Sequence, residues 1–130
     1  MNHTRQVELP VGFLEDIKEL DGSIVKCYIV LKELADITRA LGKCEKTGEA
    51  RIHCAYQYIQ TEANVSKSIV RRAIIELTIK GWICGFKRGH NGGNHKEKVS
   101  NEYLIPFVRT YSQETYNEII SWRSKKKRNP

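Results

Sequence analysis

A three-residue break between two helical stretches constrains the fold of this chain more than any other feature of its sequence. The stretches cover residues 55–63 and 67–80, and the break reads Asn64-Val65-Ser66. Asparagine tolerates the left-handed backbone conformation of a tight turn, and the Ser66 hydroxyl can accept a hydrogen bond from an amide of the second helix. Gly81 then follows, and glycine commonly caps the C-terminus of a helix. We therefore expect two helices joined by a tight turn.

The second of these helices has an apolar side and a basic side. Four apolar residues fall on one stripe that would anchor the helix on a core: Val70, Ala73, Ile74 and Leu77. Five polar residues lie near the start of the helix and off this stripe: Ser66, Lys67, Ser68, Arg71 and Arg72. The free amides and positive dipole end of a helix N-terminus suit contact with phosphate. A protruding arginine can donate two hydrogen bonds to guanine in a major groove, so Arg71 is the expected base reader.

A hairpin with a long basic tip is predicted after this helix. Residues 82–87 and 99–105 are rich in strand formers, and the connection between them is rich in glycine and asparagine. A flexible positive tip can follow the backbone or an adjacent minor groove of a duplex. The alternative interpretation is that the basic residues of the hairpin and of the helix are simply exposed to solvent and bind no partner. The basic residues of the hairpin are Lys87, Arg88, His90, His95, Lys96 and Lys98.

The positive charge of the chain is concentrated in its second half. Residues 66–130 hold 14 Lys and Arg against 5 Asp and Glu, whereas residues 1–65 hold 8 against 10. The two halves therefore carry net charges of +9 and −2. Such asymmetry is typical of a face or tail that binds a polyanion.

Apolar spacing predicts further elements on both sides of this region. Thr110 and Gln113 offer a capping box for a C-terminal helix. A first small strand is predicted at residues 51–53. The additional helices are expected at residues 13–20, 24–41 and within 107–122.

Helix, tight turn, helix and basic hairpin follow one another in the order of a winged helix-turn-helix. The sequence predicts an α+β fold that is mostly helical, with N-terminal helices before this unit and a C-terminal helix after it. One hundred and thirty residues suffice for a single packed domain. The expected parts are a flexible N-terminus (1–10), the winged domain (11–106), the C-terminal helix (107–122) and a disordered basic tail (123–130).

The residues themselves support this order of elements. The stretch NVSKSIVRRAIIELTIKGWI resembles one that GntR-like and other bacterial winged-helix regulators share. Residues 101–105 look like the close of the winged-helix domains of small phage and plasmid replication initiators. The resemblance covers about residues 50–106 and implies sequence-specific binding of double-stranded DNA. Its matching positions are Val65-Ser66, Val70-Arg71, Ile74, Leu77 and Gly81-Trp82-Ile83.

Two apolar groups are not explained by a monomeric winged domain. Ile75 and Ile79 lie opposite the core stripe of their helix, where polar residues are expected. The C-terminal helix can fold back over them, a second subunit can cover them, or Ile75 can contact a thymine methyl group. Tyr116, Ile119 and Ile120 form a further stripe. We expect these five residues to form the subunit interface of a homodimer.

The sequence carries no motif of an enzyme or of a metal site. The cysteines form no CxxC pair, and GxSxG and GxxxxGK[ST] do not occur. No apolar run approaches the length of a membrane span, and the N-terminus lacks the apolar stretch of a signal peptide. We expect a cytoplasmic, non-enzymatic protein with reduced thiols, and without a metal, cofactor, small-molecule ligand or membrane partner.

Three functions remain open from the sequence. The first is transcription control by a DNA-binding regulator. The second is a replication, partition or transfer role on a plasmid or phage, through binding to repeated sites. The third is a protein-protein interaction module whose basic tail is incidental.

Overall fold

The computed structural model describes residues 9–10, 12–45, 48–89 and 100–128, the last seven as backbone only. Its helices are α1 (Phe13–Asp16), α2 (Gly22–Ala40), α3 (Tyr56–Ala63), α4 (Lys67–Lys80) and α5 (Gln113–Arg128). Its strands are β1 (Ala50–Cys54), β2 (Gly85–Lys87) and β3 (Asn101–Ile105). These elements and their order are those of a winged helix, so the predicted α+β class is confirmed.

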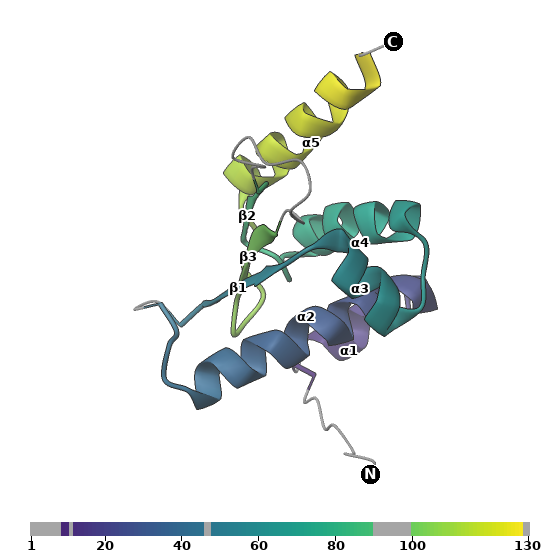
Figure 1. Cartoon of the computed structure of the whole chain (residues 1–130). Helices are drawn as coiled ribbons and strands as arrows, with labels where there is room; N and C mark the ends of the chain where they lie inside the picture. Colours follow the sequence, from purple (N-terminus) through teal and green to yellow (C-terminus); the bar gives the residue numbers. More distant parts are fainter. Residues whose placement is uncertain (1–8, 11, 46–47, 90–99, 129–130) are drawn as a thin grey trace.

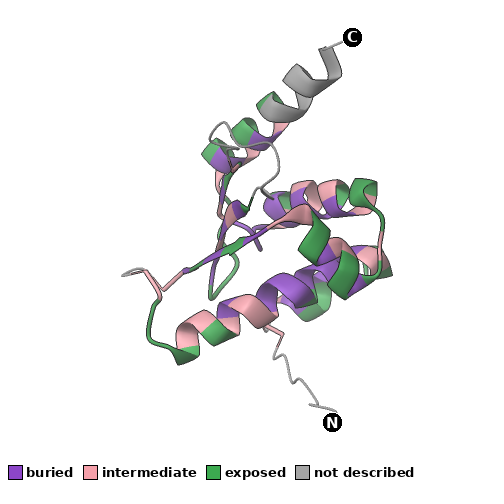
Figure 2. Cartoon of the chain, viewed as in Figure 1, coloured by how far each residue is buried: buried purple, intermediate pink, exposed green. Residues whose placement is uncertain are grey.

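Helices α2, α3 and α4 enclose the core together with one face of the sheet. Helix α2 packs against α4, α3 and β1, and α5 packs against α4 and β2. Figure 1 shows α2 and α5 at opposite ends of the molecule. Buried residues gather on the sides of α2 and α4 that face each other (Figure 2). The predicted stripe of α4 is part of this core, because Val70, Ala73, Ile74 and Leu77 are all buried.

The sheet has the strand order β1-β3-β2, and both pairings are antiparallel. Strand β1 alternates between buried and exposed residues, so one of its faces lies on the core and the other faces solvent. Gly85 stands opposite Leu104 in the register. A Cβ atom at Gly85 would lie 2.5 Å from Leu104 Cδ1, so this close approach of β2 to β3 requires glycine.

A cluster of aromatic rings ties α1 to the end of α4. The rings of Phe13 and Tyr28 stack at 4.2 Å, and the Trp82 ring meets Phe13 edge-on at 5.4 Å. The buried carboxylate of Asp16 accepts a hydrogen bond of 2.6 Å from Trp82 Nε1. It also pairs with Arg109 Nη2 at 2.9 Å. This cluster holds the N-terminal helix against the connection between α4 and β2.

Two elements are shorter than the sequence predicts. Helix α1 ends at Asp16, and turns continue the chain to the buried Leu20. The first hairpin strand begins at Gly85 rather than at residue 82. The amides of Trp82 and Ile83 both donate to the Leu77 carbonyl, which holds these two residues on the end of α4 instead of in the sheet.

The C-terminal helix lies further along the chain than expected. Helix α5 begins at Gln113, and the Ser112 hydroxyl accepts a hydrogen bond of 3.2 Å from the amide of Thr115. Thr110 does not supply the cap, because its hydroxyl donates to the Val108 carbonyl. The helix then continues through residues 123–128, which the sequence assigns to a disordered tail.

Candidate nucleic-acid interface

The turn between α3 and α4 has the geometry that the sequence predicts. Asn64 is left-handed, with φ at 56° and ψ at 56°. Ser66 is the N-cap of α4, and its hydroxyl accepts a hydrogen bond of 3.3 Å from the Ile69 amide. Gly81 ends α4 with φ at 87°, in the left-handed region. These three residues fix where the basic helix begins and ends.

The first turn of α4 presents polar and positive groups to solvent. Ser66, Lys67 and Ser68 are all exposed, and the two serine hydroxyls lie 3.1 Å apart. No acidic residue occurs in this turn. The positive end of the helix dipole and the Lys67 charge therefore act on the same region of solvent.

The two arginines of α4 are in different environments. Arg72 pairs with Asp21 at the start of α2 and with Glu76 one turn further along α4, at 2.8 and 2.9 Å. The hydrogen bond that Arg72 donates to the Glu76 carboxylate is the main reason that the pKa of Arg72 is raised above its ordinary value. Arg72 is half exposed, but its charge already has two carboxylate partners. We therefore assign Arg72 a smaller part in anion binding than the sequence suggests.

Arg71 lies about 100° around the helix axis from Arg72. Burial raises the pKa of the Tyr56 phenol to about 12, and the positive charges of Arg71 and Arg88 oppose this rise. Both charges therefore act on Tyr56, the first residue of α3. The sequence analysis did not single out Tyr56. The one feature that could have indicated Tyr56 is its position as the first helical residue after β1.

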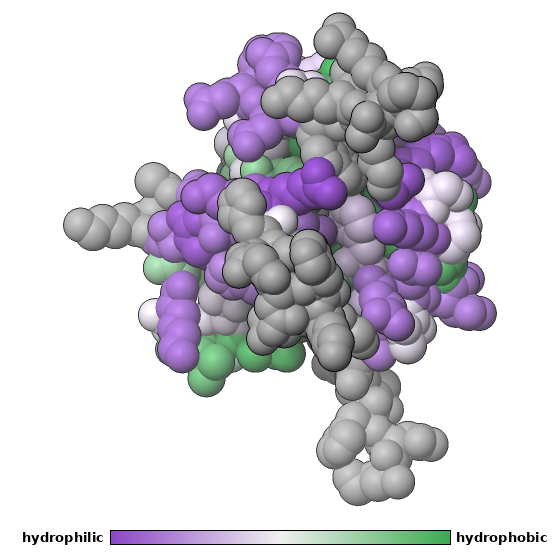
Figure 3. Space-filling model, turned by 45° about the horizontal axis from the view of Figure 1, so that its top comes forward, coloured by the Kyte–Doolittle hydropathy of each residue, from purple (hydrophilic) through white to green (hydrophobic). Residues whose placement is uncertain are grey.

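The described part of the hairpin carries both signs of charge. Lys87 and Arg88 are exposed. Lys87 stands opposite Glu102 in the strand register, and the Glu102 carboxylate accepts hydrogen bonds from Arg51 and His53. Figure 3 shows that hydrophilic residues predominate among the described residues on the face seen when the top of the molecule is turned forward. The remaining predicted hairpin residues, His90, His95, Lys96 and Lys98, lie outside the described residues.

The residues predicted for dimerisation do not form one exposed surface. Ile119 is 2% exposed and belongs to the core of this chain, so its side chain has little surface left for a subunit interface. Ile75 is partly buried against the same core. Ile79 is 48% exposed, and Tyr116 and Ile120 are partly exposed. Ile79 is thus the one exposed member of the five, and Ile75, Tyr116 and Ile120 are partly exposed.

Among the described residues, no group of three or more His, Cys, Asp or Glu side chains could hold a metal ion. None of the described helices is both long and apolar enough to cross a membrane. The four cysteines are free thiols, and burial raises the pKa of Cys54 to about 12 and that of Cys27 to about 11. High thiol pKa values disfavour the reactive thiolate form at these two positions.

Two solved structures resemble this chain. One is described as the N-terminal domain of a DNA binding protein, with a TM-score of 0.52 and 16% identity over 98% of this chain and 89% of that chain. The other is described as the structure of a Rep-DNA complex, with a TM-score of 0.52 and 17% identity over 94% of this chain and 89% of that chain. No family model and no curated protein sequence matches the chain significantly.

Proposed function

We propose that this protein binds specific sites in double-stranded DNA through the start of α4 and the base of its hairpin. In this proposal the first turn of α4 enters the major groove, where Arg71 reads a base. Lys67, Ser66 and Ser68 contact the neighbouring backbone. Lys87 and Arg88 contact the adjacent backbone from the hairpin. The proposed action is binding without catalysis.

One observation carries this proposal above the others. The N-cap Ser66 and the exposed Lys67 and Ser68 form a helix start without an acidic residue, and it projects from a winged-helix fold. A helix start of this kind satisfies phosphate oxygens and also fits the width of a major groove. The two similar structures are both described as DNA-binding, which supports the same function.

The biological role that we favour is binding to repeated sites in plasmid or phage replication. This preference rests on the description of one similar structure as a Rep-DNA complex. Transcription control is the second candidate. Genome-wide mapping of bound sites distinguishes them, because a regulator occupies promoters and a replication protein occupies iterated repeats near an origin.

Binding to a duplex should depend strongly on salt. If four to six phosphates are neutralised, the logarithm of the affinity should fall against the logarithm of salt concentration with a slope of about −4 to −5. Fluorescence anisotropy of a labelled duplex between low and physiological salt measures this slope. Lys67→Ala should make it shallower by about one, and Lys26→Ala, which removes an exposed lysine of α2, should not change it. A salt-independent affinity would instead favour a protein-protein interaction module.

We also propose that the chain forms a homodimer through the exposed parts of α4 and α5. Burying one isoleucine stabilises an interface by about 1.5–3 kcal/mol, so Ile79→Glu should weaken dimerisation by at least about tenfold. Sedimentation equilibrium of the full chain at tens of micromolar measures the dimer constant. Ile37→Glu is the matched control, because Ile37 is 53% exposed on α2. A monomer under these conditions, both free and on DNA, would contradict the proposal.

A further inference from the structure

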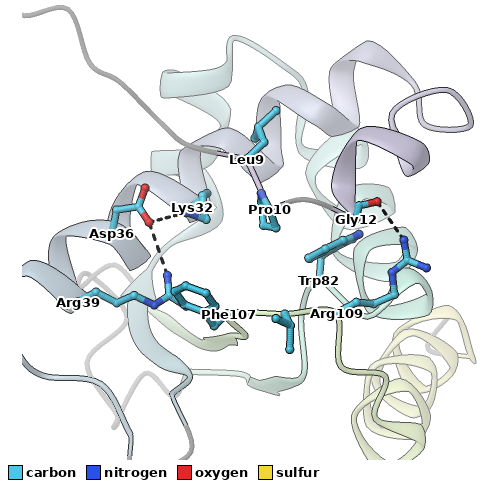
Figure 4. Close-up of a pocket in the computed structure, with 10 residues that line it drawn as sticks. Leu9, Pro10, Gly12, Lys32, Asp36, Arg39, Trp82, Phe107 and Arg109 are labelled. Carbon is cyan, nitrogen blue, oxygen red and sulfur yellow. Dashed lines mark hydrogen bonds and ion pairs between the residues drawn. The ribbon is translucent and has the colours of Figure 1, made fainter.

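A cavity of about 760 Å³ lies between α2 and the segment that joins β3 to α5. Figure 4 shows Arg39 and Phe107 on one side of it and Trp82 and Arg109 on the other, with Leu9 and Pro10 above them. Its volume is in the range of sites for small organic ligands. The cavity involves none of the residues to which we assign DNA contacts.

The cavity is positively charged. Among its described lining residues, Lys32, Arg39 and Arg109 are cationic and Asp36 is the one carboxylate. Asp36 pairs closely with Lys32, at 2.6 Å, whereas Arg39 Nη1 lies 3.5 Å from the same carboxylate oxygen. Lys32 is itself 7% exposed, so part of this charge is held away from water. A second negative group would therefore be attracted here.

The Arg39 guanidinium has unused hydrogen-bonding capacity. Its Nη2 donates to the Ile105 carbonyl at 3.3 Å. Its Nε is buried and has no hydrogen-bond acceptor in the part of the chain that the structure describes. The side chain is 18% exposed, and a buried donor without an acceptor costs free energy. The 18% of the side chain that is exposed is the part that an anion in the cavity can contact.

Flat groups line the same cavity. The Arg39 guanidinium lies over the Phe107 ring at 5.0 Å, and the Arg109 guanidinium lies over the Trp82 ring at 5.4 Å. Arg109 is held in place by Asp16 at 2.9 Å and by the Gly12 carbonyl at 3.1 Å. Phe107 is 66% exposed, so one face of its ring is available to another flat group.

We propose that this cavity binds a small organic anion with a flat ring system. The anionic group pairs with the exposed part of the Arg39 side chain, and the ring system packs against the exposed ring of Phe107. Aryl carboxylates and nucleotides share this chemistry, because both join a negative group to a planar ring. The site is independent of the proposed DNA contacts, and its test does not require DNA.

Tryptophan fluorescence provides the test. The chain has two tryptophans, so Trp82 is the sole reporter in a Trp122→Phe background. The full chain is titrated with 2-naphthoate and with adenosine 5′-monophosphate. The matched neutral molecules are 2-naphthylmethanol and adenosine. At least one anion should bind at least about tenfold more tightly than its neutral counterpart, because a charge-assisted hydrogen bond is lost in the neutral compound. The anion that binds identifies the ligand class.

Three variants connect the signal to the cavity. Arg39→Met should weaken binding about tenfold or more, and Arg39→Lys should restore part of it because the charge returns without the planar fork. Lys26→Met removes one charge from the exposed side of α2 and should leave binding unchanged. Circular dichroism and the Tm establish that each variant is folded. Equal affinity for charged and neutral probes would overturn the proposal. So would an unchanged affinity in both Arg39 variants.

Discussion

Replacing Asp16 with alanine is expected to lower the free energy of unfolding by about 2–4 kcal/mol. Asp16 is 6% exposed, and it accepts hydrogen bonds from Trp82 Nε1 and from Arg109 Nη2. Alanine leaves the buried indole N–H without an acceptor and removes the carboxylate partner of Arg109. Arg109 is 46% exposed, so water can solvate its guanidinium once the carboxylate is gone. Most of the expected loss of stability therefore comes from the buried indole N–H of Trp82, which has no acceptor in the variant.

Urea denaturation followed by circular dichroism measures this change. Asp16→Asn is expected to cost less than alanine, because an amide oxygen can still accept from the indole N–H. Glu15→Ala is the matched control, since Glu15 is an exposed carboxylate on the same helix, and it should alter stability by less than about 0.5 kcal/mol. An equal effect of the Asp16 and Glu15 alanine variants would show that the contact between α1 and Trp82 contributes little to stability.

Replacing Arg71 with alanine is expected to reduce the discrimination between a specific and a random duplex by about 1–3 kcal/mol. This value assumes two hydrogen bonds from its guanidinium to one guanine. The charges of Arg71 and Arg88 both act on Tyr56 at the start of α3. Loss of Arg71 therefore removes the proposed base contact at the centre of the candidate interface. Anisotropy with both duplexes, at one salt concentration, gives the difference in free energy.

Arg72→Ala is the matched control for this experiment. It removes the same charge from the adjacent residue, but Arg72 is held by Asp21 and Glu76. We expect Arg72→Ala to weaken binding to both duplexes only slightly and by the same factor, because no base contact is lost. If Arg71→Ala lowers the affinity for both duplexes equally, Arg71 contacts the DNA backbone and not a base. A larger loss of discrimination for Arg72→Ala would reverse the assignment of the two arginines.

The sequence determined the features of this protein that depend on neighbouring residues. Asn64, Ser66 and Gly81 predicted the turn and both ends of α4, because a cap or a left-handed residue acts within one helical turn. The period of the α4 stripe predicted which of its residues are buried. These local signals were sufficient for the winged-helix order of elements.

Only the tertiary structure decided which residues far apart in the sequence form ion pairs and pack together. Arg71 and Arg72 are equivalent in a helical pattern, and they differ because Asp21 lies beside one of them. Ile119 belongs to the core because α5 packs on β2 and α4, which its own period could not specify. The cavity joins Arg39 to Trp82 and Arg109 from three separate segments. Contacts of this kind depend on the relative placement of whole elements, which no local spacing encodes.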